Sequence, residues 1–237
     1  MSQKRVLVSQ MIISGVEIEV IKKDIKNMHL TVLSPNGSVR ITAPKNMSDE
    51  VIKRFASKKI GWVKKKIEKF QNQPRQSERK YVSGESHYLW GRKYLLDIQH
   101  TTKANNIAIK SNKLVLTVRK NSTPQRREKL LNEWYRAEIK AKLPGLFKKW
   151  ENVIGVKANA IGVKNMRTRW GSCNTKDKRV WINLQLAKKP VACLEYIIVH
   201  ELVHLLERNH TPVFYGHMDK FLPDWRLTKD ELNNFIR

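Results

Sequence analysis

Residues 195–206 read EYIIVHELVHLL, and this stretch decides how the rest of the chain is interpreted. On an α-helix, residues four apart lie on one face about one turn apart. His200 and His204 would therefore direct their imidazoles to one point, with Glu201 beside them. Apolar residues flank all three, and burying two histidines and a glutamate is costly unless they are paired or bind a metal. This HExxH pattern predicts a metal site on a buried helix. The alternative is a pair of hydrogen-bonded core histidines.

The residue types suit one Zn²⁺ ion. Neutral imidazoles bind zinc and leave it a Lewis acid, and a catalytic zinc keeps one position open for a water whose pKa falls toward about 7. Glu201 is placed to take the proton of that water and hand it to a leaving group. The sequence therefore predicts Glu201 as the base of a zinc-dependent hydrolase.

A third ligand is needed, and His210 is the best candidate. It follows His204 by six residues, and Asn209 is a residue type that ends helices and reverses the chain. Glu207 lies three residues from His204 but seven from His200, so it points along the helix axis rather than at the ion. The rival ligands are Glu195, Glu207, Asp219, Asp224 and His217.

Composition limits the class of protein and its partners. The 237 residues are 41% hydrophobic, which indicates a globular chain, and 47 Lys and Arg against 21 Asp and Glu give a net charge of +26. Such a field attracts polyanions, namely nucleic acid, nucleotides or an anionic membrane surface, although it also suits a merely soluble basic protein.

Two cysteines imply no disulfide framework and a reducing compartment. No apolar run reaches the roughly 18 residues of a membrane helix. The N-terminal stretch superficially resembles a signal peptide, but Ser9 and Gln10 interrupt its apolar core and it continues into the alternation of residues 16–20. We predict a strand there and a cytoplasmic protein without membrane contact.

Hydrophobic spacing predicts an α+β protein without internal repeats. In the first half of the chain we expect strands over 5–43 with a hairpin turn at 34–37, a basic helix from Ser48 to Phe70, a linker over 71–80 and strands over 81–118. A long helix then runs from Thr123 to about Val153 with a kink near Pro144, and a hairpin over 157–186 pairs 161–163 with 180–184. The HExxH helix, a short helix opened by Thr211 and Pro212, and a last helix after Thr228 complete the chain. We expect a β-rich region with one basic helix over 1–120 and a catalytic core over 121–237.

The combined motifs resemble the YgjP-like metal-dependent hydrolases, which are relatives of the SprT-like and WLM metallopeptidases. The motifs are RTRWGSCN at 167–174, Ile182-Asn-Leu, His200 to His204, Asn209-His210, Phe214 and Pro223-Asp224, with Ser38 to Pro44, Gly61-Trp-Val and Gly84 to Arg92 in the N-terminal half. The resemblance covers nearly the whole chain. It implies a zincin-like core, zinc bound by three histidines, and the glutamate as base. Val203 departs from the smaller residue of many relatives and is expected to tighten the packing behind the metal.

The RTRWGSC run has two interpretations. In the first, the run is a strand that borders the cleft and pairs with an extended substrate, with Arg169 contacting a carbonyl or an anion and Trp170 beside it. Alternatively, Trp170 and Cys173 pack under the HExxH helix, where a buried cysteine behaves as a small hydrophobe. A zinc-ligating or inhibitory Cys173 is the less favoured alternative. Tyr215 either stabilises an oxyanion or packs on the helix after His210.

Two basic surfaces are candidate contacts for DNA or RNA. They are the helix face with Lys53, Lys58, Lys64, Lys65 and Lys69, and the start of the long helix with Arg126, Arg127 and Lys129. Trp62 and Trp90 are candidates for stacking on bases, although tryptophans more often fill cores. Solvated lysine faces are the alternative.

Three functions remain open from the sequence. The first is a metallopeptidase that cleaves peptide bonds, with proteins bound to nucleic acid as possible substrates. The second keeps the metal chemistry but attacks a phosphoanhydride, as in a nucleotide pyrophosphatase. The third is a nucleic-acid-binding module with a structural zinc.

Overall fold

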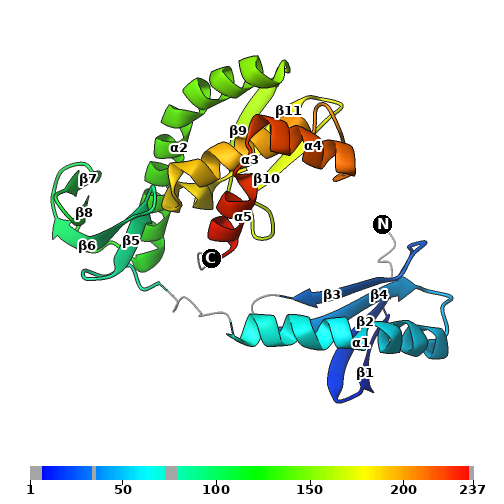
Figure 1. The fold of residues 1–237 in the computed structure, drawn as a ribbon. Coiled ribbons are helices and arrows are strands. Elements are labelled where there is room, and N and C mark those ends of the chain that lie inside the picture. The colour runs from blue at the N-terminus through cyan, green and yellow to red at the C-terminus, as the bar shows by residue number, and fades with distance from the viewer. Residues whose placement is uncertain (1–6, 34–35, 73–78, 235–237) are drawn as a thin grey trace, which may run out of the picture. The chain divides into compact units, whose positions relative to one another are not determined.

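The computed structural model describes residues 7–33, 36–72 and 79–234, which form two compact units, Met1–Arg75 and Gln76–Arg237 (Figure 1). Both units combine a sheet with helices, so the predicted α+β class is confirmed. Within the described residues, no helix is long and apolar enough to cross a membrane.

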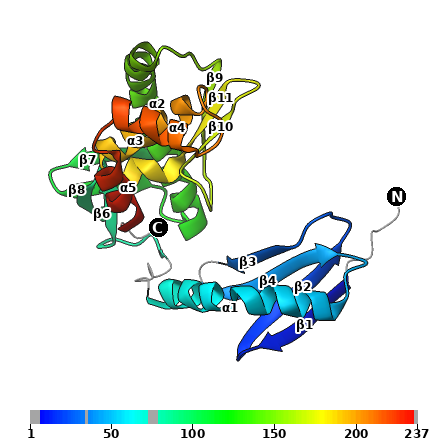
Figure 2. The ribbon, with the colours of Figure 1, turned by 45° about the vertical axis from the view of Figure 1, so that its right-hand side comes forward.

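Unit 1 is a four-stranded sheet with one helix packed on it (Figures 1 and 2). Its elements are β1 (Leu7–Ile13), β2 (Val16–Lys23), β3 (His29–Leu33), β4 (Ser38–Pro44) and α1 (Asp49–Asn72). The strand order is β1-β2-β4-β3, in which β2 and β4 are parallel and the two outer pairs antiparallel. Alternation places Ile18, Val20 and Ile41 on the sheet face that packs against Ile52 and Val63 of α1. Ser34 and Pro35 of the predicted hairpin turn, and residues 73–78 of the predicted linker, lie outside the described residues.

Unit 2 begins by repeating this arrangement. Its first elements are β5 (Ser86–Leu89), β6 (Arg92–His100), β7 (Asn106–Lys110), β8 (Lys113–Val118) and α2 (Pro124–Ile154). The order β5-β6-β8-β7 again has a parallel central pair between antiparallel outer pairs. The expectation of no internal repeat is therefore wrong at the level of structure.

The turns and caps of the two copies also correspond. The first two strands are joined by Ser14-Gly15 in unit 1 and by Trp90-Gly91 in unit 2, with φ angles of 50° and 81° and of 50° and 82°. Two successive positive φ angles are typical of a tight hairpin whose twist matches its strands. Ser48 and Thr123 then cap the two helices by accepting hydrogen bonds from backbone N–H groups three residues later.

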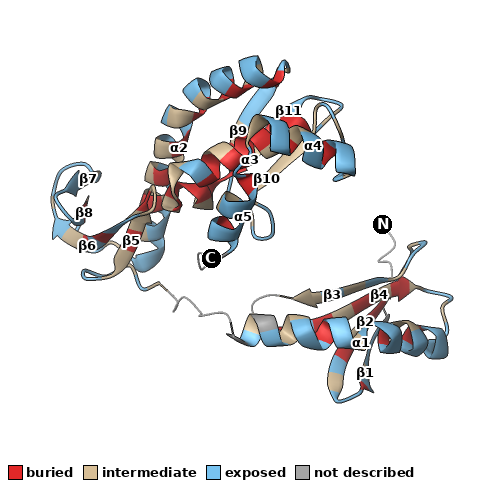
Figure 3. Ribbon diagram, in the orientation of Figure 1, coloured by how far each residue is buried: buried red, intermediate tan, exposed pale blue. Residues whose placement is uncertain are grey.

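The rest of unit 2 surrounds one buried helix. Its elements are β9 (Ala160–Lys164), β10 (Gly171–Asn174), β11 (Arg179–Asn183), the 3₁₀-helix η1 (Leu184–Lys188), α3 (Val191–Val203), α4 (Pro212–Phe221) and α5 (Trp225–Asn234). α3 packs against α2, β10, β11, α4 and α5, and Figure 3 shows its largely buried surface. The core of unit 2 therefore forms around the helix that carries the HExxH motif.

Several expected elements are corrected. Residues 160–164 do not form a hairpin with 179–183: β9 runs parallel to β11, and β10 is the antiparallel partner. The chain crosses over between β9 and β10, which the spacing of apolar residues does not reveal. Tyr81 is not in a strand and has a φ of 53°. The last helix begins at Trp225 rather than after Thr228.

The division between the units lies after Arg75, not near residue 120. β6 and β8 contribute Leu96, Leu114 and Leu116 to the same core as Leu131 and Tyr135 of α2. Because these strands bury their apolar face with α2, they belong with unit 2 and not with the sheet of unit 1.

Candidate metal centre

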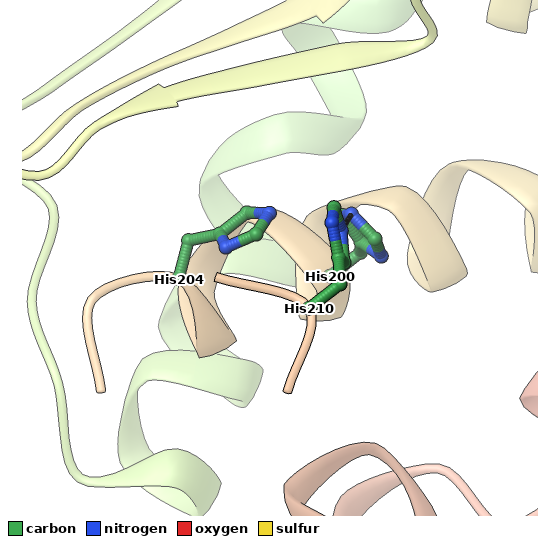
Figure 4. Close-up of side chains that lie close together, drawn as sticks. All are labelled: His200, His204 and His210. Atoms are coloured by element: carbon green, nitrogen blue, oxygen red, sulfur yellow. Dashed lines mark hydrogen bonds between the residues drawn. The ribbon is translucent and has the colours of Figure 1, made fainter. Parts of the chain in front are cut away.

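The three histidines converge at the C-terminal end of α3. His200 lies in the last turn of α3, and His204 is its C-cap residue. His210 comes from the loop before α4, and Figure 4 shows the three imidazoles facing one another. His210 Nε2 lies 3.0 Å from His200 Nε2, and one ligand nitrogen from each ring falls within 4.8 Å of the others.

This donor set fits a tetrahedral metal. With Zn–N distances of about 2.0–2.1 Å, two nitrogen ligands of a tetrahedral zinc lie about 3.3 Å apart. Among the described residues, these three histidines are the one group with the spacing of metal ligands. The candidate zinc ligands His200, His204 and His210 are thus brought together, and a tetrahedral ion held by these three would keep its fourth position for a substrate or water.

The loop after α3 turns His210 back toward the helix. His204 Nδ1 lies 3.2 Å from the carbonyl oxygen of Glu207, so an Nδ1–H tautomer donates there and leaves Nε2 for the metal. The carboxylate of Glu207 accepts from the backbone N–H of Asn209 at 3.0 Å. Glu207, a rival ligand in the sequence, therefore shapes the loop instead of joining the group.

The ring of Phe214 packs against all three imidazoles. Its ring is fully buried, and its centroid lies 5.0 Å from that of His200 and 4.7 Å from those of His204 and His210. The side chain of Thr211 caps α4 by accepting from the Phe214 N–H at 3.3 Å. The sequence includes Phe214 only as part of a resemblance, and its supporting role depends on the turn before α4.

Burial favours the neutral form of the His200 and His204 imidazoles. Desolvation, with smaller contributions from the neighbouring His204 and His210, lowers the pKa of His200 to about 3. Desolvation also lowers the pKa of His204. A metal binds neutral imidazole, so protons compete weakly for this site.

Glu201 is buried beside the histidines and close to β10. Its side chain is 4% exposed. Desolvation raises its pKa to about 8, and the positive charge of Arg169 opposes that rise. A Cβ added at Gly171 would lie 2.8 Å from the Cγ of Glu201 and closer still to Oε1. Only glycine leaves room for this carboxylate.

A pocket of about 840 Å³ opens over the site. Its lining residues are Arg169, Trp170, Gly171, Ser172, Cys173, Asn174, Thr175, Tyr196, Ile197, His200, Glu201, His204, Arg208, Asn209, His210, Lys229, Leu232 and Asn233. β10 supplies one wall and is an edge of its three-stranded sheet, so one side of its backbone pairs with no strand among the described residues.

The predicted substrate residues divide between the pocket and its surroundings. Arg169 and Trp170 line the pocket, and so does Cys173, whose pKa burial raises to about 11. Tyr215 is not among the described lining residues; its ring stacks between those of His210 and Trp225. Tyr196, one turn before His200, lines the pocket in its place and is missing from the residues predicted by sequence.

Asn183 enters the sequence analysis only as part of the resemblance, and its structural role was not predicted. It is buried, and its side-chain amide donates to the carbonyl oxygens of Met166 at 2.9 Å and of Arg169 at 2.6 Å. Its Oδ1 accepts from the N–H groups of Met166 and Gln185. Asn183 thereby ties the segment before β10 to the end of β11 and positions the wall of the pocket.

Three of the four remaining rival ligands have contacts elsewhere, and Asp224 is outside the group of converging histidines. Glu195 accepts from Lys149 and from the indole N–H of Trp150. Asp219 accepts from the side chains of Trp225 and Arg226. The imidazole of His217 stacks on Phe221, with 6.0 Å between the ring centroids.

Replacing His210 with Ala is expected to weaken metal binding strongly. Loss of even an outer-shell partner of a metal costs about 10–100-fold in affinity, so loss of a ligand should exceed about 100-fold. Competition with a chromophoric chelator measures the change. His217→Ala, which removes a nearby rival, is the matched control and should bind metal as the wild type does. Equal affinities for the wild type and His210→Ala would contradict this ligand set.

Metal removal should expose the titration of Glu201. Its pKa is raised from 4.5 to about 8, so the folded metal-free protein binds more protons than the unfolded chain between these values. The stability of the metal-free protein should therefore fall as the pH rises through that range. Glu201→Gln removes this effect, while the His200 titration is common to both proteins.

Scanning calorimetry of chelator-treated protein measures this effect. For the melting step of unit 2, the Tm of Glu201→Gln should exceed that of the wild type by about 5 °C more at pH 8 than at pH 5. The same Tm difference at both pH values would show that the folded environment does not raise the pKa of Glu201.

Three converging imidazoles beside a buried carboxylate, under a pocket with an edge strand along one wall, define the site of a metal-dependent hydrolase. The model of the family described as YgjP-like, metallopeptidase domain, matches residues 26–235. The chain therefore belongs to the YgjP-like metallopeptidase family, which confirms the resemblance found in its motifs. Membership of a metallopeptidase family implies a bound metal.

Two further comparisons add little. No curated protein matches the chain. Among solved structures, the crystal structure of the metallopeptidase zymogen of Pyrococcus abyssi abylysin is similar, with 16% identity and a TM-score of 0.35. The match covers 38% of this chain and 90% of that chain. This likeness is weak, and the family assignment rests on the family model.

Proposed function

We propose that the protein is a zinc-dependent metallopeptidase of the HExxH type, with His200, His204 and His210 as ligands and Glu201 as general base. The observation that carries this proposal is the buried Glu201 carboxylate, which lies next to the three imidazoles and against Gly171 of the edge strand β10. A structural zinc site alone requires neither a buried carboxylate nor an open strand beside it.

The residues of the chain have defined tasks in this reaction. A bound zinc ion would supply Lewis-acid activation of water and of the scissile carbonyl. Glu201 would accept a proton from the attacking water and deliver it to the leaving amine, and its raised pKa suits both steps. The free edge of β10 would pair with the backbone of an extended peptide.

Tyr196 is the candidate donor to the oxyanion. It lines the pocket, and desolvation raises its pKa to about 12, so it stays protonated at neutral pH and can donate a hydrogen bond. Tyr215, stacked on His210, would instead help to hold that ligand in place. Trp170 and Arg169 would contact the substrate from the start of β10.

The charge of the pocket favours a second candidate function, hydrolysis of a nucleotide phosphoanhydride. Arg169, Arg208 and Lys229 line the pocket, while Glu201 is the one carboxylate among the described lining residues. Three cations around one metal site suit a polyphosphate at least as well as a peptide. The same base would then activate water against phosphorus.

One assay series tests both functions. Purified zinc-loaded protein is incubated with an unfolded protein such as casein and, separately, with a panel of nucleoside triphosphates. We expect peptide fragments from casein and no release of phosphate. Release of phosphate without fragments would replace the peptidase with a pyrophosphatase, and Arg208→Ala should then raise the KM for the nucleotide about tenfold.

Two finer proposals concern the substrate, which the net charge of +26 bears on, and the location, which the cysteines bear on. Protein substrates would be bound to nucleic acid, so adding DNA at low salt should accelerate cleavage of a DNA-binding protein and leave cleavage of casein unchanged. The cytoplasm is the proposed location, since Cys173 and Cys193 are free thiols.

A further inference from the structure

One exposed stripe of α1 combines positive charge with an aromatic ring. The α1 stripe consists of Arg54, Lys58, Trp62 and Lys65, which follow one another at helical spacing opposite the buried Ile52, Ala56 and Val63. All four are exposed, and 47% of the Trp62 surface is accessible. Trp62 is therefore not among the residues that pack in the hydrophobic core of unit 1.

Charges in this part of α1 have one sign. Between Val51 and Ile67 there are seven Lys and Arg and no Asp or Glu. In the described part of the chain, Arg54, Lys58 and Lys65 form no ion pair. The Lys66 ammonium lies 6.0 Å from the centroid of the Trp62 ring. The cations of the stripe are therefore left for a partner outside unit 1.

The internal repeat provides a comparison within the same molecule. Aligning the helix caps Ser48 and Thr123 places the α1 stripe opposite Lys129, Glu133, Ala137 and Lys140 of α2, which are also exposed. Both helices pack on sheets of the same topology. The fold therefore tolerates Glu and Ala at the positions of Lys58 and Trp62, so the requirements of packing do not explain the α1 stripe.

We propose that the α1 stripe binds single-stranded nucleic acid. Lysine and arginine neutralise backbone phosphates, and an exposed aromatic ring stacks on an unpaired base whatever its sequence. A duplex would meet the cations but hides its base faces from Trp62. An anionic membrane would also meet the cations, but α1 buries its apolar face on the sheet and has none left to insert. This surface lies on unit 1, so the proposal goes beyond the chemistry of the metal centre.

The test compares two variants of equal charge in the full chain. Lys58→Glu with Trp62→Ala gives α1 the residues that α2 carries at matching positions. Lys129→Ala with Lys140→Ala removes the same two units of positive charge from α2. All proteins also carry Glu201→Gln, so that hydrolysis of the probe cannot interfere, and circular dichroism establishes that each is folded. Fluorescence anisotropy of a labelled 20-nucleotide single strand measures affinity at several salt concentrations.

We expect the α1 variant to bind about tenfold or more weakly, with a shallower salt dependence, and the α2 variant to bind within about twofold of the parent. Trp62→Ala alone should weaken the single strand and leave a duplex of the same length unaffected. If both variants lose the same affinity for the single strand, binding depends only on net charge, and the proposal is overturned. Equally tight, Trp62-independent binding to anionic phosphatidylglycerol vesicles would also overturn it, because it would identify a membrane surface. None of these results depends on whether Glu201 is the catalytic base.

Discussion

Replacing Glu201 with Gln is expected to lower kcat by about 10²–10⁴, while the metal content stays that of the wild type. Gln keeps the size of the side chain and fits beside Gly171, but it cannot take a proton from water. The three imidazoles do not depend on the carboxylate, since His204 is oriented by the Glu207 carbonyl and all three rings rest on Phe214. The measurements are kcat on the substrate that the wild type hydrolyses and metal content by mass spectrometry.

A matched control separates the base from a general loss of charge. Glu207→Gln removes the same charge six residues away and keeps an oxygen that can accept from Asn209. It should retain most of the activity. If Glu201→Gln keeps both its metal and its activity, Glu201 is not the base, and a structural zinc in a binding module becomes the better interpretation. If it loses both, the carboxylate serves metal binding instead.

Gly171→Ala, a change in β10, should also displace the Glu201 carboxylate. The added methyl group would overlap the buried Glu201 carboxylate. Overpacking of this kind costs about 1–3 kcal/mol of stability. Because the carboxylate or β10 must shift, we expect kcat to fall about 100-fold, since misplacement by 1 Å has costs of that order. Urea unfolding and steady-state kinetics measure the two effects.

Two comparisons test whether the contact of the added methyl group with Glu201 causes the loss of stability and activity. Gly216→Ala, in α4 with open space around the new methyl group, should be neutral or stabilising by up to about 1 kcal/mol. In a Glu201→Ala background the overlapping atoms are gone, so Gly171→Ala should cost far less stability than in the wild type. A cost that is unchanged in that background would place the strain elsewhere.

The parts of the site that could be predicted from sequence are those set by local geometry. His200, Glu201 and His204 share a helix face because of their spacing, and the cost of burying them indicates a metal. His210 is less certain from sequence because it depends on a loop, and that loop is shaped by a hydrogen bond from Asn209 to Glu207. A carboxylate that is a rival ligand in the sequence is a loop-forming residue in the structure.

Non-local relations could not be predicted in the same way. Pairing of β10 with β11 brings together segments that are apart in the sequence. Both the close approach of Glu201 to Gly171 and the four hydrogen bonds of Asn183 depend on this pairing. Alternating apolar residues predict that 160–164 and 179–183 are strands, but the same pattern fits parallel and antiparallel pairing. The internal repeat escaped detection because its copies share strand order and turn geometry while their side chains differ.

The separate hydrophobic cores of the two units have a thermodynamic consequence. No residue of the described core around Ile18 and Ile52 belongs to the core around α3. Heat should therefore unfold the chain in two cooperative steps rather than one, and a single melting temperature would not describe it. A metal that binds only the folded histidine site raises the melting step of its own unit alone. The step of the other unit is then a reference inside every sample, against which the metal affinities of variants can be ranked from single calorimetric scans.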